Sequence, residues 1–221
     1  MFGSHVVTAL LQFGYAAVTS RLVPDTGFGA FAVALSLAAL ITLIAQGGLG
    51  QAAARTPELV PGKLSFLILV SLGLGLVAGL LLVALALPWA LLWDAPEAVA
   101  PARVIGVTAF LAPLCGLLLG IMRRLGEFRA IAISAVITSA AGMGFGVVAV
   151  MLAPGPMTLL VSPVVAAVLL TIVALILTRH QWWARPQFAG ARGDLGFAWR
   201  VLSLTMLSYL IGNVGKWSVS R

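Results

Sequence analysis

Long stretches without ionisable side chains, separated by short charged loops, constrain this sequence more than any other feature. Residues 28–45 contain no Asp, Glu, Lys, Arg or His, and a charged turn with Arg21, Pro24 and Asp25 precedes them. Such a run is long enough to cross the hydrocarbon core of a bilayer as a helix. It ends in a cluster of Gly and Gln before Arg55, and a solvated cavity tolerates this polar backbone where lipid does not. The pattern therefore predicts a membrane-spanning helix with one end beside a hydrated space.

The same alternation of span and loop recurs along the chain and predicts an all-α, polytopic membrane protein. With 62% hydrophobic and only 9% charged residues, the chain has more apolar surface than a soluble domain of 221 residues buries. We expect a six-helix N-terminal lobe over residues 1–196, and the first helix of a second lobe over residues 197–221. The expected spans are residues 5–20, 28–45, 64–92, 104–122, 130–152 and 159–178, followed by a seventh segment at 197–219.

The basic residues are distributed unequally between the two sets of loops. Nine Lys and Arg residues follow the even-numbered spans, whereas only Arg21 and Arg103 follow the odd-numbered spans, beside acidic residues. Cytoplasmic loops are enriched in Lys and Arg, so the even loops and the N-terminus are predicted to be cytoplasmic. We interpret the net charge of +7 as basic residues that set the topology of the spans and contact the headgroups of the lipid bilayer. We expect no nucleic acid partner.

Metal and disulfide chemistry is not expected from this sequence. Cys115 is the single cysteine and falls inside a span, and His5 and His180 are far apart along the chain. We therefore expect no metal site and no cofactor.

The end of the chain repeats the pattern of the first span. Residues 16–21 read AAVTSR and residues 216–221 read KWSVSR, so each apolar segment closes on Ser and Arg. If segment seven repeats span one, the residues that follow it in the repeat would begin just past residue 221. Transporters built from repeated lobes bind substrate between the lobes. We expect this lobe to pair with a second lobe, either in the same chain or in a second copy.

Several stretches, in order, resemble the N-terminal half of a polysaccharide transporter, an oligosaccharide flippase of the multidrug/oligosaccharidyl-lipid/polysaccharide superfamily. RLVPDTGFGAFA at residues 21–32 is similar to the loop after span one, and AQGGLGQAAAR at 45–55 is similar to the end of span two. EFRAIAISAV at 127–136 resembles the start of span five, and ARPQFAGARGDLGFAWRVLS at 184–203 resembles the linker into span seven.

The last segment carries the same resemblance with two departures. Tyr209, Asn213 and Arg221 fit the pattern Tyr-x-x-x-Asn-x-Asp-Arg-x-x-x-x-Arg, while Gly215 replaces the acid and Lys216 replaces the first Arg. The resemblance implies two lobes and alternating access. The implied cargo is a lipid-linked oligosaccharide on an undecaprenyl-type carrier, moved from the cytoplasmic to the outer leaflet for cell-surface polysaccharide synthesis. It implies a multi-pass transporter, not an enzyme, in a bacterial inner (plasma) membrane.

Lys216 is the sharpest candidate for contact with such a substrate. A cation inside an apolar segment is costly unless it faces water or an anion, and a lipid-linked sugar carries a pyrophosphate. Alternatively, Lys216 snorkels to the interface from its position near the end of the segment. Asn213, in the same motif, is a further candidate.

The other candidates lie in the first two spans. Gln12, Tyr15 and Thr19 share one face of the first span, which indicates either a wet cavity wall or interhelical hydrogen bonds. Gln46 and Gln51 are expected at the mouth of the same cavity. The remaining candidates are Arg21 and Arg55, for which topology and headgroup contact are the alternative roles.

Three pairs of glycines spaced four residues apart are predicted to allow close helix packing within the lobe. They are Gly75 with Gly79, Gly116 with Gly120, and Gly142 with Gly146.

Other functions stay open at this point. One alternative is a multidrug or peptidoglycan-precursor exporter of the same superfamily, although a cation-coupled antiporter would need a buried carboxylate and the six acids lie in loops or at span ends. A membrane glycosyltransferase would need paired carboxylates or a metal-binding acidic loop, for which Asp94 and Glu97 are the only close outer pair. A non-transporting fragment is the last alternative.

Overall fold

The computed structural model describes residues 2–46, 48–55, 60–182, 184–187, 193, 195–205 and 207, with the backbone alone for residues 2–5, 25 and 26. Helices make up almost all of these residues, and no strand occurs among them. The elements are α1 (Phe2–Leu22), α2 (Asp25–Gln46), α3 (Leu49–Arg55), α4 (Pro61–Leu92), the 3-10 helix η1 (Pro96–Ala98), α5 (Val99–Arg124), α6 (Phe128–Leu152), α7 (Pro156–Leu159) and α8 (Val161–Trp182). Residues 195–205 are also helical. The predicted all-α class is confirmed.

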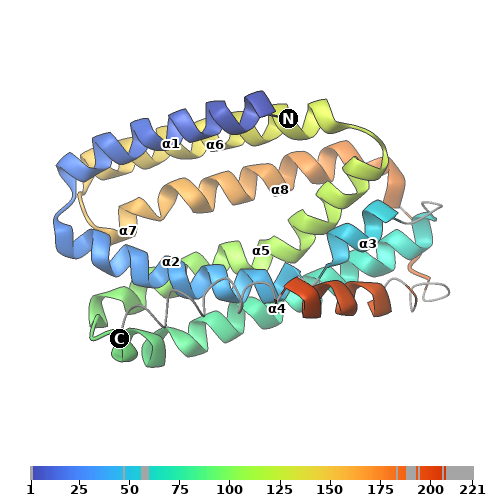
Figure 1. Cartoon of the computed structure of the whole chain (residues 1–221), viewed down its shortest axis with the longest axis horizontal. Coiled ribbons are helices and arrows are strands. Elements are labelled where there is room, and N and C mark those ends of the chain that lie inside the picture. The colour runs from blue at the N-terminus through green and yellow to red at the C-terminus, as the bar shows by residue number, and fades with distance from the viewer. Residues whose placement is uncertain are drawn as a thin grey trace.

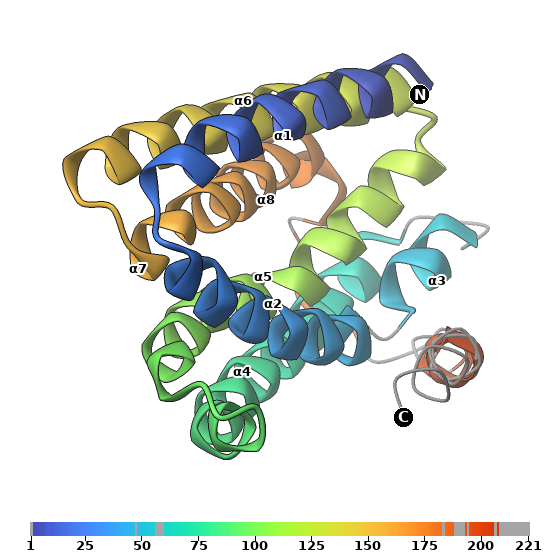
Figure 2. The ribbon, with the colours of Figure 1, turned by 60° about the vertical axis from the view of Figure 1, so that its left-hand side comes forward.

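The long helices form two layers that meet along α5 and α8 (Figure 1). In one layer α6 packs against both α1 and α8, and in the other α5 packs against α2, α3 and α4. Figure 2 shows the two layers from the side, with α1, α6 and α8 above α2, α4 and α5. Buried Leu and Ile side chains fill the second layer, so that α5 is the helix around which that layer is packed.

Five helical stretches within the described residues are long and apolar enough to cross a membrane. They are Gly27–Arg55, Pro61–Leu92, Pro96–Arg124, Phe128–Leu152 and Pro156–Trp182. They contain the five spans expected between residues 28 and 178, which agrees with a multi-pass membrane protein. The expected first span is the helix α1, but α1 is not among the five, and it carries the polar residues Thr8, Gln12, Tyr15 and Thr19.

Side chains on the outer faces of these helices are apolar and exposed. Phe13 of α1, Leu92 of α4 and Leu152 of α6 are 75%, 73% and 82% exposed. Exposure of such a surface to water is unfavourable, whereas the acyl chains of a bilayer are as apolar as the side chains themselves. The outer surface is therefore suited to lipid.

Successive long helices run in alternating directions, so the loops divide into two sets at opposite ends (Figure 1). The turns around residues 23–24, 93–98 and 153–155 lie at one end. The start of α1, the helix α3, the start of α4 and the loop before α6 lie at the other end, together with the end of α8 (Figure 2). That second end carries the described cations Arg55, Lys63, Arg123, Arg124, Arg129, Arg179, Arg185 and Arg200. The loops predicted to be rich in Lys and Arg and the loops predicted to be poor in them thus lie at opposite ends of the helices.

Two helix boundaries differ from the sequence-based expectation, each for a local reason. The loop expected up to residue 103 is already helical from Pro96, since Pro96 and Pro101 occupy first-turn positions where proline is tolerated. The Gly-rich end of the second span is a break followed by the short helix α3. Gly48 has a φ of +71°, a left-handed conformation that favours glycine, and it redirects the chain between α2 and α3.

The spaced glycines pack helices together within the lobe, as predicted. A Cβ atom on Gly75 of α4 would overlap the carbonyl oxygen of Phe110 in α5, and one on Gly120 of α5 would overlap that of Gly50 in α3. A Cβ on Gly142 of α6 would lie 2.5 Å from the carbonyl oxygen of Ser162 in α8. Because the neighbours are backbone atoms, no side-chain rotation relieves these contacts.

Candidate functional site

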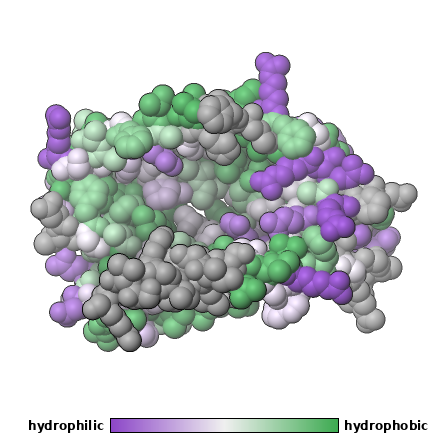
Figure 3. All heavy atoms as spheres, in the orientation of Figure 1, coloured by the Kyte–Doolittle hydropathy of each residue, from purple (hydrophilic) through white to green (hydrophobic). Residues whose placement is uncertain are grey.

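A groove runs between α2, α5 and α8, where the two layers of helices diverge. Figure 3 shows this face of the molecule hollowed between the two layers, with both apolar and polar side chains around the hollow. Two adjoining cavities, with volumes of about 400 and 360 Å³, form it and share Leu43 and Gln46. We call the two together the central groove. Its α5 wall is a single helix face, because Cys115, Leu119 and Arg123 repeat at four-residue intervals.

The polar side chains of the central groove gather at its end beside α3. Gln46 ends α2, Gln51 lies on α3 and Arg123 lies in the last turn of α5. Thr205, from the helical residues 195–205, lines the same end. Two amides and a guanidinium supply several N–H donors and two carbonyl acceptors, a set suited to phosphate and sugar oxygens.

The part of the central groove away from α3 is mostly apolar. Ala38 and Ala39 of α2, Ile105 of α5 and Ala167 of α8 line it, and Pro163 lies in the first turn of α8. The hydroxyl of Thr108 on α5 also lines it but donates to the carbonyl of Ile105 on its own helix, at 2.7 Å. A polar headgroup is therefore matched at one end of the groove and a hydrocarbon chain along the rest.

The candidates from the first span lie apart from the central groove. Tyr15 points into the contact between α1, α6 and α8, where its hydroxyl lies 3.5 Å from the carbonyl oxygen of Leu159. A Cβ on Gly146 would lie 2.9 Å from the same hydroxyl. Thr19 is buried and donates to the carbonyl of Tyr15 at 2.8 Å. Gln12 is exposed. Of the two roles considered for this face, the bond from the Tyr15 hydroxyl to Leu159 of α7 corresponds to interhelical hydrogen bonding.

The two arginine candidates also lie outside the central groove. The guanidinium carbon of Arg55 stands 4.8 Å from the centroid of the Phe197 ring, a cation–π contact that holds α3 to residues 195–205. Arg21 is exposed in the last turn of α1, at the opposite end from α3. Lys216 and Asn213 lie outside the described residues.

Arg123 is the groove residue that sequence reasoning missed as a binding candidate. It was assigned to topology because it belongs to a basic loop, RRLGEFR at residues 123–129. The available signal was its register, eight residues after Cys115 on the face of α5 that carries the small residue Gly116. The sequence does not say which helix faces that side, so the register alone does not separate Arg123 from Arg124.

Residues 195–205 close the central groove on the side of α3. Leu202 and Thr205 line the groove, and Ala198 is buried against the α2–α3 break. A Cβ on Gly48 would lie 2.7 Å from the carbonyl oxygen of Ala198 and 2.8 Å from Cβ of Val201. Gly48 thus sets how closely this helical segment approaches the groove.

The substitution Gly48→Ala is expected to loosen residues 195–205, and Gly126→Ala is its matched control. Both glycines have left-handed φ values, +71° and +76°, so both variants incur a backbone cost of about 1–2 kcal/mol. Only at Gly48 does the new Cβ collide with a neighbour, because nothing lies within 4 Å of a Cβ on Gly126. Limited trypsin digestion should therefore cleave at Arg200 faster in Gly48→Ala alone. Equal cleavage of both variants would contradict this packing.

No group of three or more His, Cys, Asp or Glu side chains able to hold a metal ion occurs within the described part of the chain. Cys115 is a free thiol, and it is partly buried in the groove wall.

Comparison with known proteins gives one match. A family model described as "Polysaccharide biosynthesis protein" matches residues 18–220 of this chain. No curated protein and no solved structure matches it. The match covers the central groove in full but only the last turn of α1.

Proposed function

The chain belongs to the polysaccharide biosynthesis protein family, and from this premise we propose that it is a membrane flippase, not an enzyme. Its proposed cargo is a lipid-linked oligosaccharide, carried from the cytoplasmic to the outer leaflet of a bacterial inner membrane. The observation that carries the proposal is the central groove, which combines a polar end at Gln46, Gln51 and Arg123 with an apolar interior.

The physical obstacle to such transport is the headgroup. Moving a pyrophosphate and sugar hydroxyls through hydrocarbon costs several kcal/mol for each unsatisfied polar group and far more for each bare charge. A groove that supplies a guanidinium and amide donors replaces part of the lost hydration, while the carrier chain stays in an apolar environment. Gln46, Gln51 and Arg123 are proposed to hold the headgroup in this way.

Alternating access requires a second wall for the groove. We propose that a second lobe, in the same chain or from a second copy, faces α2 and α8 and closes the groove alternately at either end. The apolar character of the groove walls supports this arrangement.

We propose that the cation-rich end of the helices faces the cytoplasm, with the N-terminus on that side. Single cysteines at positions 125 and 153, in a Cys115→Ser background, test the orientation because Leu125 and Ala153 are exposed at opposite ends. In intact cells an impermeant maleimide should label Ala153→Cys and leave Leu125→Cys unlabelled until the membrane is opened. The reverse labelling would overturn the orientation.

The test of transport is a reconstituted assay with the full-length protein. Liposomes carrying a lipid-linked oligosaccharide should lose about half of their outer-leaflet sugar to the lumen, as measured by an impermeant lectin, only when the protein is present. Absence of movement in an uncoupled assay and under an imposed ion gradient would refute the proposal.

Lys216→Ala is expected to slow that transport without reducing membrane insertion. A cation in the apolar segment at 197–219 is predicted to pair with the pyrophosphate, and alanine removes the charge. The measurement is the transport rate per reconstituted molecule, with insertion checked by carbonate extraction. An unchanged rate would assign Lys216 to the membrane interface instead.

A further inference from the structure

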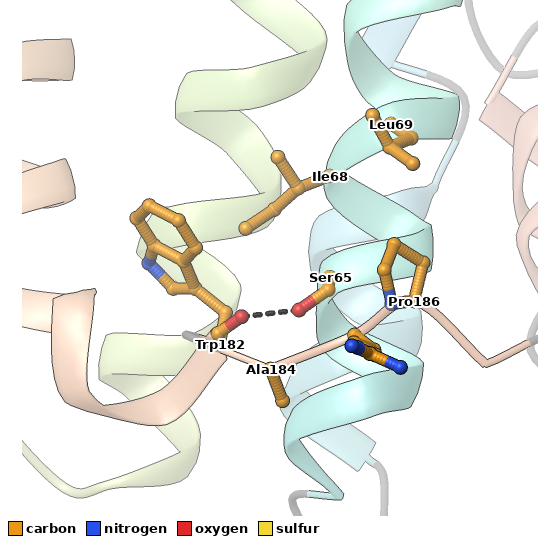
Figure 4. Close-up of a pocket in the computed structure, with 7 residues that line it drawn as sticks. Ser65, Ile68, Leu69, Trp182, Ala184 and Pro186 are labelled. Carbon is orange, nitrogen blue, oxygen red and sulfur yellow. Dashed lines mark hydrogen bonds between the residues drawn. The ribbon is translucent and has the colours of Figure 1, made fainter.

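A second cavity lies away from the central groove, at the cation-rich end of the helices. It has a volume of about 570 Å³ and lies between the first turns of α4, the end of α8 and the chain that follows α8 (Figure 4). Its lining residues are Ser65, Ile68, Leu69, Trp182, Ala184, Arg185 and Pro186. We call it the α4–α8 slot. It shares no lining residue with the central groove.

Two hydrogen bonds to backbone carbonyls fix the shape of the α4–α8 slot. The hydroxyl of Ser65 donates to the carbonyl of Trp182, and the N–H of Gln187 donates to the carbonyl of Gly62 at 2.8 Å. A Cβ on Gly62 would lie 2.9 Å from the carbonyl oxygen of Arg185, so the first turn of α4 and the segment after α8 are in direct contact. Residues 184–187 are thus held against the first turn of α4, and the slot is part of the packed fold.

The interior of the slot is apolar and its rim is cationic. Figure 4 shows the Trp182 indole facing Ile68 across the cavity, with Leu69 and Pro186 on the other side. The indole Nε1 donates to the hydroxyl of Thr178 at 3.3 Å, which fixes the orientation of the ring. Arg185 is exposed at the rim. An apolar recess beside an exposed guanidinium and a tryptophan matches a lipid at the membrane interface.

The surroundings of the slot select the charge of that lipid. Among the described side chains at this end of the helices, Glu127 is the one acid, and the cations are Arg55, Lys63, Arg123, Arg124, Arg129, Arg179, Arg185 and Arg200. The local potential is therefore positive and attracts an anionic headgroup more strongly than a zwitterionic one.

We propose that the α4–α8 slot binds an anionic phospholipid of the surrounding leaflet. One acyl chain lies against Ile68, Leu69 and Trp182, and the phosphate lies beside the Arg185 guanidinium. This lipid is a resident of the protein and not its cargo, because the slot is separate from the groove. By occupying the slot, it fastens residues 184–187, which follow α8, to the start of α4.

The test is native mass spectrometry of the detergent-solubilised full-length protein with added phosphatidylglycerol or phosphatidylcholine. The first phosphatidylglycerol should bind the wild type about fivefold more tightly than phosphatidylcholine. Arg185→Gln should abolish the preference, whereas Arg103→Gln, the same change of charge at the opposite end, should keep it. Equal binding of the two lipids to the wild type, or an equal effect of the two variants, would overturn the proposal.

A second pair of variants tests the acyl site separately from the charge. Leu69→Trp fills the slot and should weaken binding of both lipids, while Leu80→Trp, at another exposed position of α4, should leave binding unchanged. Similar lipid binding by these two variants would overturn the assignment to the slot. Displacement of phosphatidylglycerol by an equimolar undecaprenyl pyrophosphate would also overturn it, since the slot would then belong to the cargo. Neither readout depends on transport.

Discussion

Replacing Gly75 with valine is expected to separate α4 from α5 and to remove most of the folded protein from the membrane. Even a single Cβ at this position would overlap the carbonyl oxygen of Phe110, and valine adds two further methyl groups. Overpacking in a well-packed core costs about 1–3 kcal/mol, and we expect at least the upper value here because the colliding atoms are backbone. Fluorescence-detected size exclusion should show a loss of the monodisperse peak and a lower Tm.

Gly73→Val is the matched control for that experiment. Gly73 lies two residues earlier on the same helix, is exposed, and has no atom within 4 Å of a Cβ position. The two variants share the change in composition and differ only in the face of α4 that receives the side chain. A similar fall in Tm for both would mean that the α4–α5 contact does not limit stability.

Replacing Arg123 with glutamine is expected to reduce transport of the proposed cargo by about tenfold or more. A charge-assisted hydrogen bond contributes about 1.5–3 kcal/mol, and each 1.4 kcal/mol corresponds to a factor of ten in affinity. Because Arg123 is exposed in the groove, the loss should appear in the transport rate at low substrate and not in the Tm. Arg123→Lys should retain part of the rate, since it keeps the charge and loses the bidentate geometry.

Arg129→Gln controls for the loss of a positive charge at the same end. Arg129 is exposed in the first turn of α6 and does not line the central groove. If topology were the whole role of these arginines, the two glutamine variants would behave alike. Equal transport by both would remove Arg123 from the proposed binding site.

The membrane-spanning helices could be predicted from the sequence because the bilayer leaves few alternatives. A long apolar run in a bilayer must form the hydrogen bonds of its backbone within itself, as a helix does. The apolar runs at residues 64–92 and 130–152 therefore predict their helices directly. The short helix α3 could not be found in this way. Its seven residues are too few to show an apolar period, and its position depends on Gly50 fitting between Gly116 and Gly120 of α5.

The groove could be predicted only in part. The spacing of residues along the sequence shows which side chains share a helix face, but it does not show which other helix that face contacts. Gln46 was expected at the mouth of the same cavity as Gln12, Tyr15 and Thr19; it lines the central groove, but none of those three residues does. Tyr15 and Thr19 share a face of α1 as expected, but that face meets α6 and α8. The sequence does not distinguish Arg123 from the neighbouring arginines, because only the packing of α5 against α8 shows which of them reaches the groove.

The partner of α1 has a consequence for the order in which the chain is assembled during synthesis. α1 packs along α6, so more than a hundred residues separate the two sides of that contact. We expect α1 to emerge first and to keep its Tyr15 face without this partner until Gly146 has left the ribosome. α2 meets α4 and then α5 much sooner. We therefore expect the layer of α2, α4 and α5 to be complete before the layer of α1, α6 and α8 closes, so that the protein assembles one layer at a time.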